Sequence, residues 1–321
     1  MSAQPHEVVL PAYGVESGLT RLIEMLSAAE GAPEVRVDFQ RVKFYRPSAI
    51  VAVLARVKAW LVRGATVRFA NHRECEAFRY LQRIDFFQTA GLNLPEDFFR
   101  RDRADRFVPV REISVVGSNI GVIATEITEC FAPEGFILNP FYPLLQYALG
   151  EVLSNCKQHA KAMGFVAAQY TPRDDRVHFA VADIGIGIRE SFRQSQSPHF
   201  RESMTDLEAV TLALRPYVSS VSHLPHIYGR PSNMGVGLSM LREITLKLHG
   251  SMFLASGRAW WTYDVEGRER QGDLTGESRW SGVICALSLR RNAVEDYSKH
   301  LAEARDALRL TSGVSRGTRR T

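Results

Sequence analysis

The sequence predicts a mixed protein of helices and strands in two parts: an α/β N-terminal domain and a larger α+β sandwich. In the first hundred residues, strand-like and helix-like stretches alternate, as in a sheet with helices packed against it. In the second part, strand-like and helix-like stretches are segregated, which favours an α+β sandwich over a doubly wound sheet. The chain has 321 residues, 45% of them hydrophobic, which is enough to bury a hydrophobic core and to form two domains of common size.

A β-α-β unit is predicted within the first part. The β-rich run EVRVDFQRV starts at Glu34, the run PSAIVAVLARVKAWLVRG has apolar residues at helical spacing, and ATVRFAN is again strand-like. Pro47 suits the first turn of this helix, Ser48 is expected to cap it, and Gly64 suits the position after its end. No chemically active residues cluster in this part.

Six strands are predicted in the second part. Their sequences are FVPVREI, FVAAQYTP, RVHFAVADIG, SMFLASG, AWWTYDV and SGVICALSL. The turn-like PRDD joins the second strand to the third. Between the third and fourth strands lies a long polar segment, in which Thr205 and Glu208 match a capping box at the start of a helix.

The stretch LGEVLSNCKQHA places an acid, an amide and an imidazole four residues apart, at Glu151, Asn155 and His159. Positions i, i+4 and i+8 of a helix lie on one face, so the three groups are expected to stand together. The apolar positions beside them are Leu149, Val152 and Leu153. Chance spacing on a surface helix is the alternative interpretation of this stretch alone.

Two glycine-rich stretches follow. ADIGIG puts Asp183 at a strand end, followed by Gly185 and Gly187, while GVGL supplies Gly235 and Gly237 at a helix start. Glycines allow a ligand to approach the backbone, and a helix N-terminus favours phosphate. Each stretch alone is more typical of an ordinary turn, and the sequence has no GxxxxGK[ST] phosphate loop.

In this order, the three stretches resemble the GHKL, or Bergerat-fold, ATP-binding domain of histidine kinases, DNA gyrase, mismatch-repair proteins, the heat-shock chaperone and anti-sigma-factor kinases. EVLSNCKQHA matches the N box of that family, DIGIG its DxGxG box and GVGL its GxGL box. The resemblance covers residues 108–292 and implies ATP and Mg²⁺ as cofactors.

The resemblance also implies roles for single residues. Asn155 would ligate Mg²⁺. A single protein ligand is compatible with this ion, because magnesium takes most of its other ligands from phosphates and water. Asp183 would accept a hydrogen bond from the exocyclic amine of adenine. Residues 189–233 would form a lid over the nucleotide. The residues implied to line the nucleotide are Gly185, Gly187, Gly235, Gly237 and Leu238.

Three further positions leave alternatives open. Glu151 would act as general base on water or a hydroxyl, or would only hold the water shell of the metal. His159 would contact phosphate or be an ordinary helix histidine, and Arg230 would reach the γ-phosphate or remain solvated. The family usually has Gly-Thr on the closing strand where this chain has Gly282-Val283, and loss of that hydroxyl predicts ATP binding weaker by about 1 kcal/mol.

Residues 7–100 resemble the STAS domain of anti-sigma-factor antagonists, and residues 1–107 are assigned to it. The resemblance rests on VDFQRVKFYRPSAIVAVLARVKAWLVRGATVRFAN and on FRYLQRIDFFQTAGL. Where that family commonly has Asp-Ser-Ser-Gly, with a phosphorylatable first serine, this chain has Arg46, Pro47, Ser48 and Ala49. Pro47 has no hydroxyl, so we expect a docking or sensing domain without a phosphoserine switch there.

The function expected is a regulatory ATPase or an anti-sigma-type serine/threonine protein kinase, in which one of the two domains, N-terminal or ATP-binding, regulates the other. The alternative is a module that binds ATP, does not hydrolyse it, and uses it to gate protein binding. A histidine kinase is disfavoured because His6 and His72, the only histidines before His159, lie in no predicted helix hairpin. A gyrase-like ATPase is disfavoured because no transducer-domain length follows residue 292.

Composition bounds the partners and the compartment. The N-terminus lacks the basic start and apolar run of a signal peptide, and no stretch of about 18 apolar residues occurs, so a cytoplasmic protein without a membrane partner is expected. The net charge of +5 is modest, and much of it falls within residues 290–321. Residues 293–321 are expected to be a helix and a basic disordered tail, so nucleic acid is not expected. The partner expected is a protein, and a homodimer is compatible. The four cysteines are expected to be reduced and mostly buried.

Overall fold

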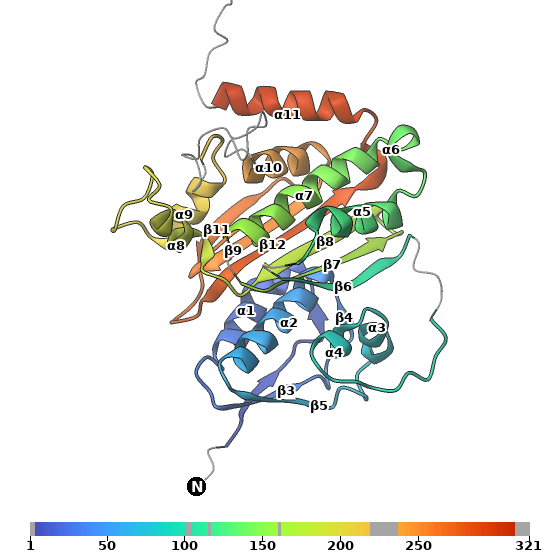
Figure 1. Cartoon of the computed structure of the whole chain (residues 1–321), viewed down its shortest axis with the longest axis vertical. Coiled ribbons are helices and arrows are strands. Elements are labelled where there is room, and N and C mark those ends of the chain that lie inside the picture. The colour runs from blue at the N-terminus through green and yellow to red at the C-terminus, as the bar shows by residue number, and fades with distance from the viewer. Residues whose placement is uncertain (1–3, 101–104, 115–116, 160–161, 219–236, 312–321) are drawn as a thin grey trace, which may run out of the picture.

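A computed structural model describes residues 4–100, 105–114, 117–159, 162–218 and 237–311. Figure 1 shows its elements in successive layers: the C-terminal helix, a layer of helices, a large sheet, a second layer of helices, and a small sheet. The fold is therefore mixed α and β, with a parallel sheet in the N-terminal part and a large antiparallel sheet in the rest.

The N-terminal part is built on a three-stranded parallel sheet in the order β1-β3-β5, with β3-α2-β5 forming the predicted β-α-β unit. A two-stranded parallel ladder joins β2 to β4. The elements are β1 (His6–Val9), β2 (Tyr13–Gly14), α1 (Leu19–Ser27), β3 (Glu34–Asp38), β4 (Phe44–Tyr45), α2 (Pro47–Val62), β5 (Thr66–Ala70), α3 (Phe78–Arg83) and α4 (Phe86–Thr89).

The ends of α2 differ from the prediction at one residue. Pro47 is its first residue and Gly64, with φ of +84°, follows its end, as expected. The expectation that Ser48 caps the helix is wrong, because the cap residue is Arg46 and Ser48 is buried one position inside the helix. The Ser48 hydroxyl instead donates to Glu16 Oε1 at 3.2 Å. That carboxylate, also paired with Arg46 at 2.8 Å, supplies the negative charge that a helix N-terminus favours.

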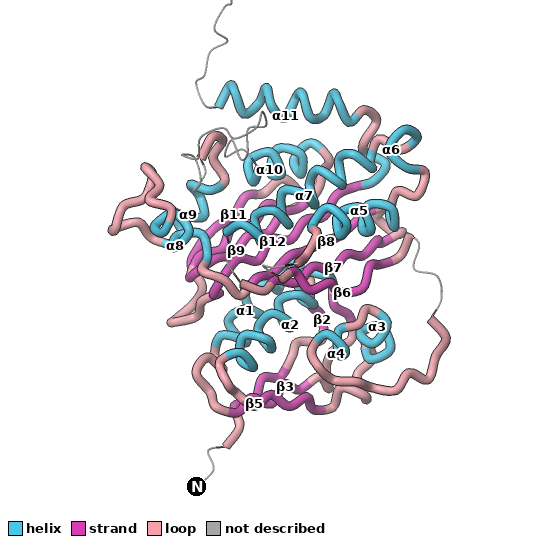
Figure 2. The backbone as a smooth tube through the Cα atoms, in the orientation of Figure 1, coloured by secondary structure: helices cyan, strands magenta, loops and turns pink. Residues whose placement is uncertain are grey.

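The large sheet has seven strands, all antiparallel, in the order β11-β10-β9-β12-β8-β7-β6 (Figure 2). All six predicted strands are present in it. The edge strand β11 was not predicted, because its sequence ERQGD is polar and its side chains are mostly exposed. The strands are β6 (Phe107–Ile113), β7 (Gly164–Thr171), β8 (Arg176–Asp183), β9 (Ser251–Gly257), β10 (Ala259–Tyr263), β11 (Glu269–Asp273) and β12 (Trp280–Arg290).

Helices of the second part gather on one face of this sheet, and the last helix packs over them (Figure 1). Its buried residues Leu301, Ala304 and Leu308 recur at helical spacing and join the same core. The predicted Thr205–Glu208 capping box is present at the start of α9. The helices are α5 (Ile120–Phe131), α6 (Gly135–Leu138), α7 (Phe141–His159), α8 (Gly187–Gln194), α9 (Asp206–Ala213), α10 (Gly237–Lys247) and α11 (Tyr297–Thr311).

The other face of the large sheet is covered by the N-terminal part, since α2 packs across β7, β8 and β12. Side chains of β8 alternate between the two faces: Ala180 and Ala182 belong to the core shared with the N-terminal part, while Phe179 and Val181 belong to the core under α5, α7 and α10. The two parts of the chain therefore share one hydrophobic core, and an apolar contact joins the N-terminal part to the sheet.

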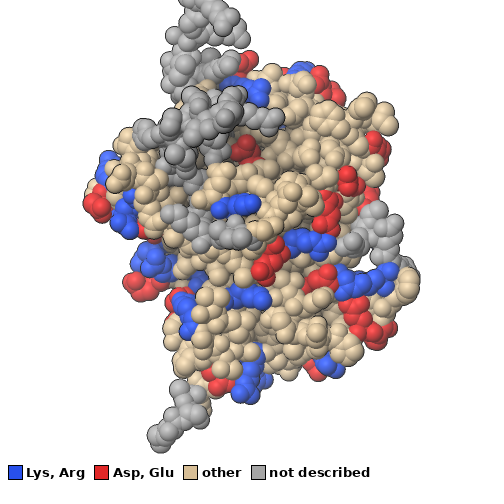
Figure 3. Space-filling model, in the orientation of Figure 1, with Lys and Arg blue, Asp and Glu red and all other residues tan. Residues whose placement is uncertain are grey.

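The cysteines are as expected from the sequence. All four cysteines are free, and three of them are buried. Among the described residues, no helix has the length and apolar character needed to cross a membrane. On the face in Figure 3, basic and acidic side chains are interspersed over the described residues.

Candidate functional site

The motif residues that can be placed come from four elements and the turn after β8. Glu151 and Asn155 lie on α7, Asp183 ends β8, and Gly187 begins α8. Gly237 and Leu238 begin α10, and Gly185 lies in the turn after β8. The predicted site residues Arg230 and Gly235, residues 219–233 of the predicted lid, and the side chain of His159 lie outside the described part of the structure.

The helix predicted from LGEVLSNCKQHA forms as part of α7. Leu149, Val152 and Leu153 are buried against the large sheet, which fixes how the helix is turned about its axis. Glu151 and Asn155 are half-buried on the same helix, four residues apart. The prediction that these two polar groups share a helix beside an apolar stripe is thus confirmed.

Asp183 is a buried carboxyl group, 2% exposed, at the end of a central strand of the sheet. Its Oδ1 accepts the Gly185 N–H at 2.9 Å. Burial raises the pKa of Asp183 to about 7, and hydrogen bonds from the main-chain N–H groups of Gly185 and Val283 oppose the shift. Among the described residues, no cationic side chain pairs with this carboxyl group. A carboxyl group buried in this way is costly in the free protein and is typical of a functional site.

Two glycines shape the space around Asp183. A Cβ on Gly187, which has φ of +77°, would lie 2.8 Å from Ser256 Oγ, and the hydroxyl oxygen already accepts the Ile188 N–H at 2.9 Å. Gly282 has φ of +101°, and a Cβ there would overlap both the main-chain carbonyl and the carboxylate of Asp183. The DIGIG turn is therefore packed directly on β9 and β12, where only glycine fits at these two positions.

A third glycine brings α7 to the same place. Gly164 of β7 stands opposite Asp183 in the β7-β8 ladder. A Cβ on Gly164 would overlap the Sγ of Cys156, the residue that follows Asn155 on α7. Burial, assisted by the charge of Asp183, raises the pKa of the Cys156 thiol, which keeps it protonated and unreactive. The middle of α7 and the end of β8 are thus in contact.

The start of α10 meets the other side of α7. A Cβ on Gly237 would overlap the Glu151 carboxylate, so the backbone of α10 lies directly against that group. Burial raises the pKa of Glu151, and a hydrogen bond from Tyr147 opposes the shift. The apolar side chain of Leu238 is partly buried against the core, which holds the first turn of α10 in place. A helix N-terminus and a carboxyl group of raised pKa therefore adjoin one another.

The donors for a cation are few. In the described ranges, no three His, Cys, Asp or Glu side chains are grouped so that they could hold a metal ion. The Asn155 amide is half-buried and has no hydrogen-bond partner among the described residues. One amide oxygen beside phosphate oxygens and water fits the coordination habit of Mg²⁺, so the residues present fit a magnesium ion that arrives with a nucleotide.

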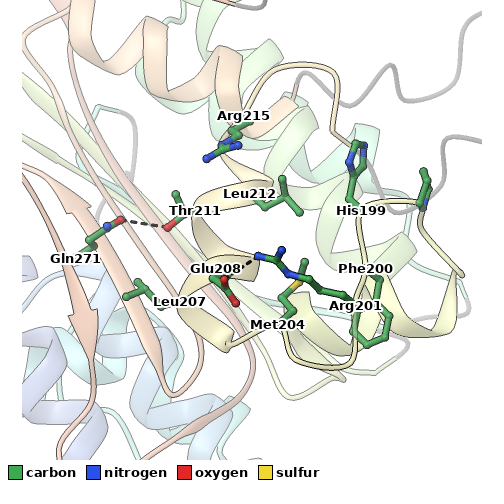
Figure 4. A pocket seen from close by; sticks show the side chains of 11 residues that line it. His199, Phe200, Arg201, Met204, Leu207, Glu208, Thr211, Leu212, Arg215 and Gln271 are labelled. Atoms are coloured by element: carbon green, nitrogen blue, oxygen red, sulfur yellow. Dashed lines mark hydrogen bonds and ion pairs between the residues drawn. The ribbon is translucent and has the colours of Figure 1, made fainter.

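A separate surface pocket of about 600 Å³ lies between α9 and β11 (Figure 4). Thr211 of α9 donates to Gln271 of β11 at 3.2 Å across it, and Arg201 pairs with Glu208 at 2.9 Å. Its lining residues fall mainly within the described part of the predicted lid and include none of the residues predicted to contact the nucleotide. No sequence motif marked this pocket.

Sequence reasoning missed residues that support the site, Tyr147 and Ser256 among them. Tyr147 precedes Glu151 by one helical turn and hydrogen-bonds to its carboxylate, and the i, i+4 spacing is a signal that pointed to it. Ser256 supports the DIGIG turn from β9, a strand about 70 residues further along the chain. That contact depends on strand order in the sheet, so no local pattern predicts it.

A scan against protein-family models matches no family, and a search of curated proteins finds no relative of this chain.

Proposed function

We propose that the chain binds Mg-ATP between α7, the turn after β8 and the start of α10, as in the GHKL family that its motifs resemble. The observation that carries the proposal is the buried carboxyl group of Asp183, against which Gly282 packs so closely that no side chain fits at the glycine. Recognition of an amino group on a purine gives a reason for a carboxylate buried at a strand end with only main-chain N–H donors around it among the described residues.

In this proposal, Asp183 accepts a hydrogen bond from the exocyclic amine of adenine. The triphosphate extends toward the first turn of α10, whose main-chain N–H groups at Gly237 and Leu238 favour anions. Asn155 holds Mg²⁺, which neutralises charge on the phosphate oxygens. Gly185, Gly187 and Gly235 line the nucleotide, while His159 and Arg230 contact its phosphates.

The reaction that we propose is attack on the γ-phosphorus by water or by a protein hydroxyl, which breaks the bond to the β,γ-bridging oxygen and releases ADP. Glu151 accepts the proton of the attacking oxygen, and its raised pKa brings it closer to the pH at which a general base works best. The chain then acts as a regulatory ATPase or as a serine/threonine kinase of the anti-sigma type. A cytoplasmic location and a protein that regulates the chain or accepts its phosphate belong to the same proposal.

The N-terminal part belongs to the proposal as a STAS-like docking or sensing domain. Its α2 packs on the strands that carry Asp183 and Gly282, so the domain is in contact with the sheet that forms the base of the site. The serine expected at the head of this helix, Ser48, is buried. We therefore propose docking without phosphorylation at that position.

The experiment compares ATP binding, phosphate release and phosphate transfer, using ATP labelled at the γ-position, in wild type, Glu151→Gln and Glu129→Gln. Glu129 is exposed on α5 and serves as the matched control. An ATPase or kinase predicts that Glu151→Gln keeps binding and loses turnover, while Glu129→Gln keeps both. Binding without turnover in wild type would favour the non-hydrolysing alternative, and equal turnover in all three would refute the role of Glu151.

A further inference from the structure

A buried arginine joins the N-terminal part to the loop before β12. Arg56 of α2 is 2% exposed. Its Nη1 pairs with Glu30 Oε2 at 2.5 Å, and its Nη2 donates to the main-chain carbonyl of Arg279 at 3.0 Å. Its guanidinium also lies 4.8 Å from the ring centre of Trp280. A buried charge is stabilised only when it is paired and hydrogen-bonded, so these contacts fix the guanidinium in one position.

Trp280 carries the connection on to the predicted nucleotide site. It is 1% exposed, and its indole N–H donates to the main-chain carbonyl of Asp183 at 3.2 Å. The pairing of β12 with β9 is irregular between Trp280 and Val283, and Gly282 lies within that irregularity. Such a bulge redirects side chains, and here both Trp280 and Gly282 lie against Asp183.

The same loop is held twice more by the N-terminal part. Glu24 Oε1 accepts the Thr275 N–H at 2.8 Å, and Ser27 Oγ accepts the Arg279 N–H at 3.0 Å. Both acceptors lie on α1, whereas Arg56 lies on α2. Residues 274–279 are therefore fixed to two helices of the N-terminal part before the chain enters β12 at Trp280.

We propose that Arg56 and Trp280 are positioning residues of the nucleotide site, through which the N-terminal part sets the place of Asp183 and hence the preference for adenine. The inference rests on the proposed function, because it assigns a cause to the geometry of the same carboxyl group. A hydrogen bond weakens steeply when its geometry is lost, so movement of the Asp183 main chain reduces recognition of the amine. The triphosphate contacts, on α7 and α10, stay in place.

The test measures affinity for Mg-ATP and for Mg-purine riboside triphosphate, which lacks the exocyclic amine, together with the number of ligands bound per chain. Trp280→Phe keeps a ring for Arg56 and removes the N–H donor, together with some buried volume that the control below also removes. We expect it to bind ATP about tenfold more weakly and to bind the purine analogue as wild type does. Arg56→Lys, which keeps the charge without the planar fork, is expected to lower the ratio of the two affinities in the same direction.

Trp261→Phe is the matched control. Trp261 is equally buried in the same sheet and also loses an indole hydrogen bond, to Glu269 Oε1 at 2.8 Å, on substitution. It is expected to leave the affinity ratio unchanged. If Trp280→Phe does not fold, Glu30→Gln replaces it. Glu30 is more exposed than Arg56, its substitution removes the charge that pairs with Arg56, and the same change in the affinity ratio is expected.

The outcomes separate this inference from the proposed function. A folded wild type that binds neither ligand overturns both. Wild-type binding that Asp183→Asn abolishes, with an unchanged affinity ratio in Trp280→Phe and Arg56→Lys, overturns the inference alone. A loss that is equal for both ligands, or that appears only as fewer ligands bound per chain, assigns Arg56 and Trp280 a purely structural role and also overturns it.

Discussion

Gly237 lies so close to Glu151 that a single methyl group on the glycine would overlap the glutamate carboxylate. The first turn of α10 thus contributes its backbone to this contact, and the middle of α7 contributes the half-buried carboxylate of Glu151. This contact brings the GVGL and EVLSNCKQHA stretches together, although about 80 residues separate them in the chain.

Gly237→Ala is expected to displace Glu151 and to lower turnover of ATP by about ten- to hundredfold, because general bases tolerate little misplacement. Gly150→Ala is the control, since it changes the neighbour of Glu151 on α7 at a position with open space. It should keep turnover and raise the free energy of unfolding by about 0.5–1 kcal/mol, as expected for glycine in a helix interior. Steady-state turnover and chemical denaturation check both results, and equal turnover in the two variants would contradict the packing argument.

Val283→Thr is expected to strengthen ATP binding about fivefold. Val283 follows Gly282, and its main-chain N–H lies within hydrogen-bonding range of the Asp183 carboxylate. Threonine has nearly the same shape as valine and supplies the hydroxyl that the resemblance expects beside adenine, which is worth about 1 kcal/mol. Titration with Mg-ATP measures the change, and Val283→Ala is the control that removes bulk without adding a hydroxyl. An affinity for ATP in Val283→Thr no higher than that of wild type would count against adenine lying at this strand.

Asp183→Asn is expected to stabilise the fold as it abolishes ATP binding. Burial raises the pKa of Asp183 to about 7, against 3.8 for the ordinary group. The folded protein therefore keeps a proton that the unfolded chain has lost, and the carboxyl group costs stability increasingly as pH rises from about 4 to 7. Asparagine removes this cost, so the variant should exceed wild type at pH 8 by an amount on the order of 2–4 kcal/mol. Denaturant unfolding at pH 5 and 8 measures it; a gap that shrinks with rising pH would contradict the argument.

His178 is expected to make the fold sensitive to acid. It is 1% exposed on β8, and burial is the main cause that lowers its pKa from 6.5 to about 4. Arg46 and Arg176 lower the pKa further, while Glu16 and Asp174 oppose them. Between pH 6.5 and 4 the unfolded chain binds a proton that the folded protein does not, so stability is complete above that window and falls through it by about 3 kcal/mol.

Denaturation of wild type and His178→Leu across this pH range isolates the effect of His178. The variant removes the titrating group and keeps an apolar side chain of similar size, so its stability should change less between pH 6.5 and 4. The same pH slope in both proteins would show that other groups cause the acid sensitivity.

Local patterns predicted most elements because each carries its own signal. Apolar residues at helical spacing mark α2 and α7, the strand-like run RVHFAVADIG marks β8, and Thr205 with Glu208 marks the start of α9. Strand β11 was missed because an exposed edge strand needs no apolar face. Ser48 was expected as a cap from its residue type, but the carboxylate that it binds comes from Glu16, a position outside the helix.

The candidate site also has a part that local sequence predicts and a part that it does not. Its polar and glycine positions stand in short motifs and can be read locally, whereas the residues that hold them come from elsewhere. Ser256 supports the DIGIG turn from β9, and Trp280 holds Asp183 from the start of β12. Arg56 contacts Arg279 and Trp280 from α2. These contacts depend on strand order and on how α2 packs, which no local window contains.

The most direct test of the central claim is calorimetric titration of the full chain with Mg-ATP, beside Asp183→Asn and Asn155→Ala. The account predicts that wild type binds one ATP per chain, that Asp183→Asn removes binding, and that Asn155→Ala loses the part of the affinity that depends on Mg²⁺. Circular dichroism of each protein confirms that it is folded. A folded wild type that binds no ATP, or variants that bind it as wild type does, would contradict the claim that these residues form a nucleotide site.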